Sequence, residues 1–170
     1  MYSANPVGWS TLTNVTGTGD VPHVGESLQI ALNRILRWAS RPAVSTALAG
    51  PSAVGLSPTD LWLLDGITRH GPLRASDIAA WQGVDKSTMT AQLRRLSARG
   101  LVARETDPAD GRAALVRATE EGWRLHAAVT SNGAKVLDAL LAEWDPADRQ
   151  ELARLLTRLA DSTGRPLQRR

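Results

Sequence analysis

The chain has 170 residues, of which 20 are Lys or Arg, 17 are Asp or Glu and 42% are hydrophobic. This length and composition are typical of a globular domain that can bury its own core. Because the chain contains no cysteine, disulfides, thiolate metal sites and thiol nucleophiles are excluded. It has no apolar run of about 18 residues and no signal-peptide pattern, so we expect a cytoplasmic protein without a membrane span.

The first 56 residues predict an arm followed by a helix. Residues 1–22 contain Gly, Thr, Asn and Pro with little apolar periodicity, which predicts a flexible N-terminal arm. Residues 24–56 predict a dimerisation helix over 24–39 and a connection that holds a short helical piece. The helix is amphipathic because its apolar residues share one stripe. These residues are Leu28, Leu32, Ile35, Leu36 and Ala39.

Residues 57–118 predict a winged helix-turn-helix. Ser57 followed by Pro58 is typical of a helix start, because Ser caps the helix and Pro is tolerated at its first position. Two shorter helices then follow, at about 75–82 and 86–99, and the tight turn between them makes a helix-turn-helix.

Extended segments and two further helices complete the prediction. Residues 101–106 and 112–118 predict a β-hairpin, the two-stranded wing. Residues 119–162 predict two C-terminal dimerisation helices, the first reaching about Trp144, and residues 163–170 form a basic tail. Asn132 and Gly133 predict a kink or hinge in the first of them, since both are poor helix formers. The predicted fold class is mainly α (α+β), with helices flanking a winged helix-turn-helix.

The helices at the two ends of the chain each carry an apolar stripe that needs a partner. Packing them together, and against the same helices of a second copy, buries both stripes, and symmetric dimers are the commonest oligomers. We therefore expect a homodimer. A monomer whose end helices fold back onto the core is the alternative.

Four segments together resemble a known family. They are LRASDIA (73–79), VDKSTMT (84–90), LSARGLVAR (96–104) and DPADGR (107–112). Their order and spacing are similar to those of the MarR (multiple antibiotic resistance regulator) family of bacterial winged-helix transcription factors. The resemblance covers about residues 56–161. It implies a dimer built from both chain ends, two lobes that bind double-stranded DNA, and a small ligand that often releases the DNA.

Several positions depart from the family pattern. Arg74 stands where a small hydroxyl residue usually caps the first helix of the motif, and Gln82 stands where an apolar residue is usual. We expect Trp81 to cover the space that Gln82 leaves. Gly111 stands where the family often has a second wing arginine, so one DNA contact is expected to be missing.

The helix 86–99 carries most of the candidate DNA-binding residues. Met89, Leu93 and Leu96 are expected to face the core, which leaves a small, polar and basic face for the major groove. The residues on that face are Lys86, Ser87, Thr88, Thr90, Ala91, Arg94 and Arg95. Either arginine can bind phosphate or guanine, and the sequence leaves that choice open.

The hairpin tip carries two further candidates. Arg112 is placed to enter a narrow minor groove, which attracts arginine. Asp110 can orient the Arg112 guanidinium by an ion pair, and the resemblance implies the same two roles. A surface ion pair without a role in binding is the alternative.

Other site types have less support in the sequence. Trp38 and Trp62 are candidate ligand-binding residues for a small aromatic effector, and core filling is the alternative. His23, His70 and His126 lie far apart, and no nucleophile or phosphate-loop motif accompanies them. We therefore predict no catalytic residue, no metal ligand and no cofactor. A metal sensor using His70 or His126 remains an open alternative without paired ligand spacing.

The predicted function is a homodimeric, ligand-responsive repressor that binds a pseudo-palindromic operator. A transcriptional activator of the same fold is one alternative, and a winged-helix module that binds protein is another. Residues 84–104 carry five basic residues and one acidic residue, and this balance favours DNA over a protein partner.

Overall fold

The computed structural model of the chain describes residues 23–163. The predicted arm, residues 1–22, and the basic tail from residue 164 onward lie outside the described residues. The chain divides after Ala39 into two compact units. None of the helices in residues 23–163 is both long and apolar enough to span a membrane.

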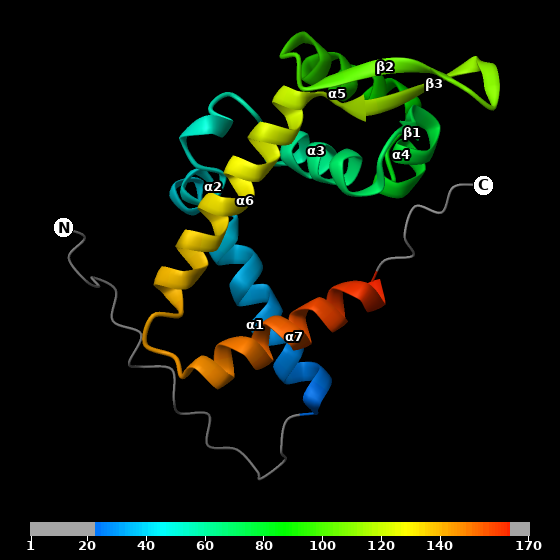
Figure 1. Ribbon diagram of the computed structural model, residues 1–170. Coiled ribbons are helices and arrows are strands. Elements are labelled where there is room, and N and C mark those ends of the chain that lie inside the picture. Colours follow the sequence, from blue (N-terminus) through cyan, green and yellow to red (C-terminus); the bar gives the residue numbers. More distant parts are fainter. Residues whose placement is uncertain (1–22, 164–170) are drawn as a thin grey trace. The chain divides into compact units, whose positions relative to one another are not determined.

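The described part of the first unit is helix α1 (Val24–Ala39), shown in blue in Figure 1. Its bounds confirm the predicted amphipathic helix. Four side chains of its apolar stripe are exposed, those of Leu28, Leu32, Ile35 and Leu36, and Ala39 is half-buried. Trp38, in the last turn, is half-buried.

The second unit contains the helices and strands of the predicted winged helix-turn-helix and of the C-terminal region (Figure 1). In chain order they are α2 (Pro42–Ala49), the 3₁₀ turn η1 (Pro51–Ala53), α3 (Pro58–His70), β1 (Leu73–Arg74), α4 (Ala75–Gln82), α5 (Lys86–Ala98), β2 (Val102–Asp107), β3 (Asp110–Ala118), α6 (Glu120–Leu140) and α7 (Pro146–Thr163). The order confirms the predicted fold class, although α6 ends before the predicted Trp144.

Helix α3 begins where Ser57 and Pro58 predict a helix start. The Ser57 hydroxyl oxygen accepts a hydrogen bond from the backbone N–H of Asp60 at 3.2 Å. The Asp60 carboxylate in return accepts one from the Ser57 backbone N–H at 3.1 Å. This reciprocal cap satisfies two backbone donors that the helix itself leaves unpaired.

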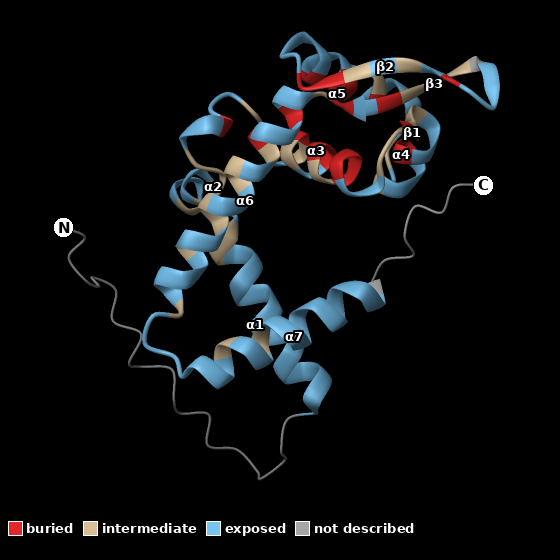
Figure 2. Cartoon of the chain, viewed as in Figure 1, coloured by how far each residue is buried: buried red, intermediate tan, exposed pale blue. Residues whose placement is uncertain are grey.

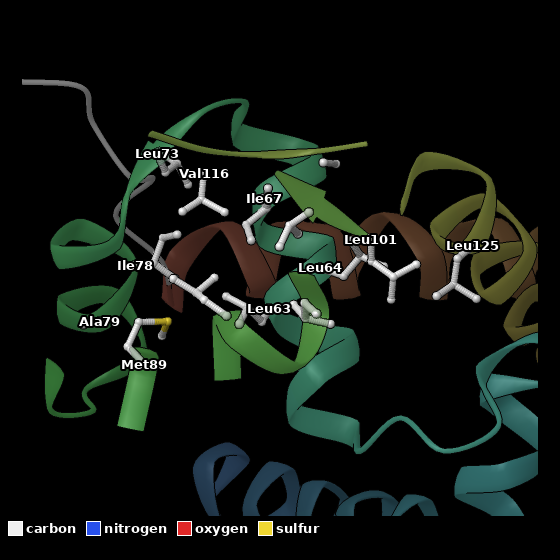
Figure 3. Close-up of a cluster of buried hydrophobic side chains, with 14 residues drawn as sticks. Leu63, Leu64, Ile67, Leu73, Ile78, Ala79, Met89, Leu101, Val116 and Leu125 are labelled. Carbon is white, nitrogen blue, oxygen red and sulfur yellow. The ribbon is translucent and has the colours of Figure 1, made fainter. Parts of the chain in front are cut away.

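The core lies within the winged helix-turn-helix and the start of α6 (Figure 3). Helix α3 supplies Leu63, Leu64 and Ile67, and α5 supplies Met89, Leu93 and Leu96 as predicted. The remaining core members come from the strands, from α4 and α6, and from the segment before β2, and they include Leu73, Ile78, Leu101, Val102, Val116 and Leu125. This cluster fixes the position of α5 relative to α3 and the sheet.

The sheet has three antiparallel strands in the order β1-β3-β2, one more than the predicted two-stranded wing. The hairpin β2–β3 is confirmed, but its turn is tighter than expected because Asp107 pairs with Asp110. Strand β1 pairs with β3 through Leu73 opposite Val116 and Arg74 opposite Leu115. Strand β1 was not predicted, because two residues are too few to carry a detectable periodicity.

Helix α6 starts in close contact with the sheet. Thr119 caps it by accepting a hydrogen bond from the Gly122 backbone N–H at 3.0 Å. A Cβ atom on Gly122 would lie 2.1 Å from the carbonyl oxygen of Leu101. Only glycine therefore allows this approach of α6 to the segment before β2.

Helix α6 continues without interruption through Asn132 and Gly133, where the sequence predicts a kink or hinge. The Asn132 amide instead donates hydrogen bonds to the carbonyl oxygens of Ala47 and Leu48 at the end of α2, the latter at 3.3 Å. The weak helix formers in this pair are thus explained by tertiary docking of α2 onto α6.

Candidate nucleic-acid interface

A tight turn orients α5. Gly83 ends α4 with a positive φ of 65°, a conformation that glycine adopts without steric cost. Val84 is half-buried, and Asp85 then caps α5 by accepting a hydrogen bond from the backbone N–H of Thr88 at 2.9 Å. One side of α5 is buried in the core, so the opposite side is turned to solvent.

The seven residues that the sequence analysis selected on α5 lie on or beside this outward side. Lys86, Ser87, Thr88, Ala91, Arg94 and Arg95 are exposed, and Thr90 is half-buried. The helix therefore presents them together while Met89, Leu93 and Leu96 anchor it. A helix with short side chains at its leading end can approach base edges in a major groove.

Asp85 organises the hydroxyl groups at the start of α5. Its carboxylate accepts hydrogen bonds from the hydroxyls of Ser87 at 2.5 Å and Thr88 at 2.7 Å. These bonds hold the pKa of Asp85 well below its ordinary value, and the bond from Ser87 has a larger effect than those from Thr88. The Thr90 hydroxyl donates to the carbonyl oxygen of Lys86 at 2.7 Å.

This arrangement limits what the three hydroxyls offer to a ligand. Each proton is already donated within the protein, so the oxygen atoms are left as hydrogen-bond acceptors. Ser87 and Thr88 were predicted as polar contacts to DNA, whereas Asp85 was not predicted to have a role. The capping pattern of an Asp before a Ser-Thr pair is the signal that identifies it.

The two neighbouring arginines of α5 differ in their surroundings. A guanidinium Nη2 of Arg95 lies 2.9 Å from a carboxylate oxygen of Asp60, whose side chain is only 5% exposed. Burial alone would raise the pKa of Asp60, but hydrogen bonds from Ser57 and from Arg95 lower it on balance. Arg95 therefore ties α5 to the capped start of α3.

Arg94 and Lys86 carry no such tie. Both are exposed, and neither side chain makes a hydrogen bond or an ion pair with any residue in the described range 23–163. Their charges are available to an anionic partner without breaking an internal contact. Among the cations on α5, Lys86 and Arg94 can thus bind DNA without the energetic cost of breaking an internal ion pair.

The end of α5 is held by a further arginine that the sequence analysis did not select. An Nη1 of Arg99 donates a hydrogen bond to the carbonyl oxygen of Val54 at 3.0 Å. Gly55 follows with a φ of 79°, and a Cβ there would lie 2.5 Å from the Arg99 guanidinium. The loop before α3 is therefore fitted closely around Arg99.

At the wing, Asp110 is exposed and lies 3.6 Å from an Nη2 of Arg74. Arg112 lies in β3, and its side chain is outside the part of the chain that the structure describes. The ion pair between Asp110 and Arg112 thus stays a prediction. Arg74 does not cap α4 with its side chain and instead bonds to Asp107, a pairing across 33 positions that the sequence did not indicate.

The tryptophans lie in different settings. Trp62 on α3 is 66% exposed, whereas the Trp81 ring packs against α3 so closely that a Cβ on Gly66 would lie 2.8 Å from it. Trp81 thus contacts α3 although it is 42% exposed, and the expectation that it covers the space beside Gln82 stays a prediction. The Gln82 side-chain oxygen beside it is buried and has no hydrogen-bond partner among the described residues.

His126, one of the two histidines considered for a metal sensor, is paired with an acidic residue. An Nε2 of His126 on α6 lies 2.7 Å from a carboxylate oxygen of Asp65 on α3. Burial would raise the pKa of Asp65, and hydrogen bonds from His126 and Arg69 outweigh that effect and lower it. Within residues 23–163, no three His, Asp or Glu side chains lie close enough to hold a metal ion.

Comparison with known proteins agrees with this geometry. The sequence model of the MarR family matches residues 54–113. YxaD of Bacillus subtilis, described as an uncharacterised HTH-type transcriptional regulator, is 31% identical over 57% of this chain and 68% of its own length. NicR of Pseudomonas putida, described as an HTH-type transcriptional repressor, is 29% identical over 55% of this chain and 59% of NicR.

Solved structures share the fold. The structure of BpsR of Bordetella bronchiseptica, described as regulated in its DNA binding by 6-hydroxynicotinic acid, is 24% identical, with a TM-score of 0.55, and the match covers 85% of this chain and 99% of BpsR. The helix-turn-helix, the wing and the relatives lead to one assignment. The chain belongs to the MarR family of DNA-binding, winged-helix transcriptional regulators.

Proposed function

We propose that the chain is a homodimeric, ligand-responsive repressor that binds a pseudo-palindromic operator in double-stranded DNA. The observation that carries this proposal is the outward side of α5, where Lys86 and Arg94 flank short polar side chains and their own side chains have no hydrogen-bond or ion-pair partner among residues 23–163. The name of NicR supports the repressor assignment. A two-fold dimer would contact half-sites about 10 bp apart, one turn of DNA.

The residues of α5 divide into three roles in this proposal. Lys86 and Arg94 bind phosphate or the acceptor edge of guanine. The oxygen atoms of Ser87 and Thr88 accept hydrogen bonds from the exocyclic amines of adenine or cytosine, because their own protons are held by Asp85. The small Ala91 and the half-buried Thr90 allow close approach, and Arg95 keeps the helix in place.

The dimer is proposed from two apolar stripes. Leu28 and Leu32 on α1 are 58% and 48% exposed, and Leu155 and Leu156 on α7 are 45% and 50% exposed. Covering such stripes with a second copy removes apolar surface from water on both chains. The proposed dimer thus uses α1 and α7 of each chain.

The effector is proposed from the tryptophans. Trp62 is an exposed aromatic side chain on α3, and Trp38 lies in the last turn of α1. The printed description of BpsR, whose fold is the same, names an aromatic acid as the regulator of its DNA binding. A small aromatic compound that contacts either tryptophan would weaken the binding of DNA, and quenching of tryptophan fluorescence by such compounds tests this.

The central experiment titrates the protein onto fluorescent DNA from upstream of its own gene, at two salt concentrations and with unrelated competitor DNA. Binding that resists competitor and weakens with salt is expected. Arg94→Ala should weaken it by about 1 to 3 kcal/mol. Lys135→Ala is the matched control, since Lys135 is an exposed cation on α6 whose side chain has no hydrogen-bond or ion-pair partner among residues 23–163.

The other outcomes identify the alternatives. Binding that competitor abolishes contradicts a specific operator-binding role, and absence of binding at either salt favours the protein-interaction module. Arg112→Ala tests the wing separately and should weaken binding by about 1 to 3 kcal/mol if Arg112 enters the minor groove. Transcription of the adjacent genes should rise when the gene is deleted, whereas an activator gives a fall.

A further inference from the structure

Arg74 lies in β1, next to the β2–β3 hairpin that forms the wing. Its backbone belongs to β1 and pairs with Leu115 of β3. Its side chain extends to the end of β2, where Nε and Nη2 donate hydrogen bonds to the same carboxylate oxygen of Asp107, at 3.0 and 2.6 Å. One arginine therefore connects the edge strand β1 to both strands of the hairpin.

Asp107 also contacts the turn of the hairpin, so it links Arg74 to that turn. Its second carboxylate oxygen accepts a hydrogen bond from the backbone N–H of Ala109 at 2.9 Å, inside the two-residue loop between β2 and β3. Its side chain is 9% exposed, so water competes little for the bonds. The register of the hairpin also shifts between Thr106 and Asp107, where the regular ladder gives less support.

We infer that Arg74 is a positioning residue: it holds the wing through Asp107 in the orientation that binds DNA, and it does not itself contact DNA. This inference rests on the proposed binding of DNA by the wing that carries Arg112. It explains why an arginine stands at the start of α4, where its side chain contributes nothing to capping the helix.

A direct phosphate contact is the competing role, because the Arg74 side chain is basic and 41% exposed. The two roles predict opposite effects when the charge of Asp107 is removed. If Arg74 binds a DNA phosphate, loss of the Asp107 charge frees the guanidinium and removes a repulsion between Asp107 and the phosphate, so the affinity for DNA rises. For a positioning residue, the wing loses its attachment and affinity falls.

The first test measures amide hydrogen exchange in the free protein, so it does not depend on DNA. Arg74→Ala and Asp107→Asn should each increase exchange in residues 106–113 by about fivefold or more, since local opening exposes those amides. Arg74→Lys should do the same, because an ammonium lacks the planar pair of donors. Unchanged exchange in all three folded variants overturns the inference.

Glu105→Gln is the matched control. Glu105 lies in the same strand as Asp107 and pairs with Arg117 at 2.9 Å. The substitution removes one negative charge from the sheet, as Asp107→Asn does, but leaves the link to β1 intact. Faster exchange at the wing in this variant as well would overturn the inference, because any lost charge would then have the same effect.

The second test measures affinity for the duplex that the wild-type chain enriches most from a random-sequence DNA library. Arg74→Ala and Asp107→Asn should each lower affinity about tenfold, and the double variant no further, because preorganisation is lost only once. The slope of log affinity against log salt should stay unchanged. A rise in affinity for Asp107→Asn, or a slope reduced by about 0.9 for Arg74→Ala, overturns the inference.

The two tests separate this inference from the proposed function. If the wild-type chain enriches no sequence, specific DNA binding fails, and the exchange data alone decide whether Arg74 orders the wing. If the wild-type chain binds its enriched duplex and the variants bind equally well, the proposed function stands and the positioning role is wrong.

Discussion

The winged helix-turn-helix and helix α7 use similar leucine patterns with different outcomes. Leu63, Leu93 and Leu96 of the winged helix-turn-helix are at most 2% exposed, whereas Leu155 and Leu159 of α7 are 45% and 49% exposed. Figure 2 shows this contrast as red segments around α3 and the sheet and pale blue along α7. The winged helix-turn-helix buries its leucines within one chain, whereas α7 leaves its leucines exposed. Apolar periodicity alone therefore does not tell whether a helix packs against its own chain or against another molecule.

Helix α6 shows both behaviours in one element. Its first turns bury Gly122 and Leu125 against the winged helix-turn-helix, and its end exposes Leu137 and Leu140 at 46% and 56%. A helix that is buried at one end and apolar but exposed at the other is suited to connect the winged helix-turn-helix to the proposed dimer interface. Substitutions at its two ends therefore test the comparison between the regions.

Gly122→Ala should have the largest effect on stability. The added Cβ would lie 2.1 Å from the Leu101 carbonyl oxygen, which is backbone and cannot rotate away. Either α6 or the segment before β2 must move, and such overpacking lowers the free energy of unfolding by about 3 kcal/mol. Urea denaturation of the purified variant measures this. A loss below about 0.5 kcal/mol, typical of surface changes, would show that α6 is not held against Leu101.

Leu156→Glu should break the proposed dimer without unfolding the winged helix-turn-helix. Leu156 is 50% exposed on α7, so a carboxylate there is tolerated in a monomer but not in an apolar interface. Sedimentation should show half the wild-type mass, and operator affinity should fall about tenfold or more because two linked half-sites are no longer bound. Arg158→Gln, an equal change in charge on the same helix, is the control and should keep the dimer.

Much of this organisation follows from local sequence signals. Ser57 with Pro58, Asp85 before Ser87 and Thr88, and Thr119 before two glutamates each mark a helix start by side chains that cap nearby backbone donors. The buried positions Met89, Leu93 and Leu96 follow from helical periodicity. Signals of this kind act within about four residues, so a single sequence is enough to find them.

Long-range pairing is what the sequence did not reveal. Arg95 with Asp60 and Arg74 with Asp107 join residues 35 and 33 positions apart, and nothing local marks these arginines as internal ties. The same holds for Asn132, whose amide docks α2, although its weak helix propensity suggested a hinge. The neighbours of each of these residues in the sequence do not reveal its role, because that role depends on a partner far away in the sequence.

Asp60→Asn should alter how the stability of the winged helix-turn-helix depends on pH. The pKa of Asp60 is lowered in the folded state from an ordinary 3.8, so its charged form stabilises the fold above that pH. This stabilisation is lost as pH falls through the folded-state pKa. Urea denaturation at neutral pH and below pH 3.8 should show a deficit of the variant at neutral pH that shrinks in acid. Asp138→Asn, an exposed carboxylate on α6, is the control, and an equal shrinkage there would contradict the role of Asp60.

Gly133→Ala should have the smallest effect, and one of opposite sign to Gly122→Ala in the same helix. A Cβ on Gly133 would lie 3.7 Å from the Leu48 carbonyl oxygen, an ordinary contact, and φ there does not require glycine. Alanine should therefore raise the free energy of unfolding by about 0.5 to 1 kcal/mol through its better helix propensity. A matched measurement of operator affinity decides whether Gly133 acts as a hinge. Unchanged affinity with the gain in stability assigns the pair Asn132-Gly133 to docking α2, whereas weaker binding despite greater stability would mean that α6 must bend at Gly133 when DNA binds.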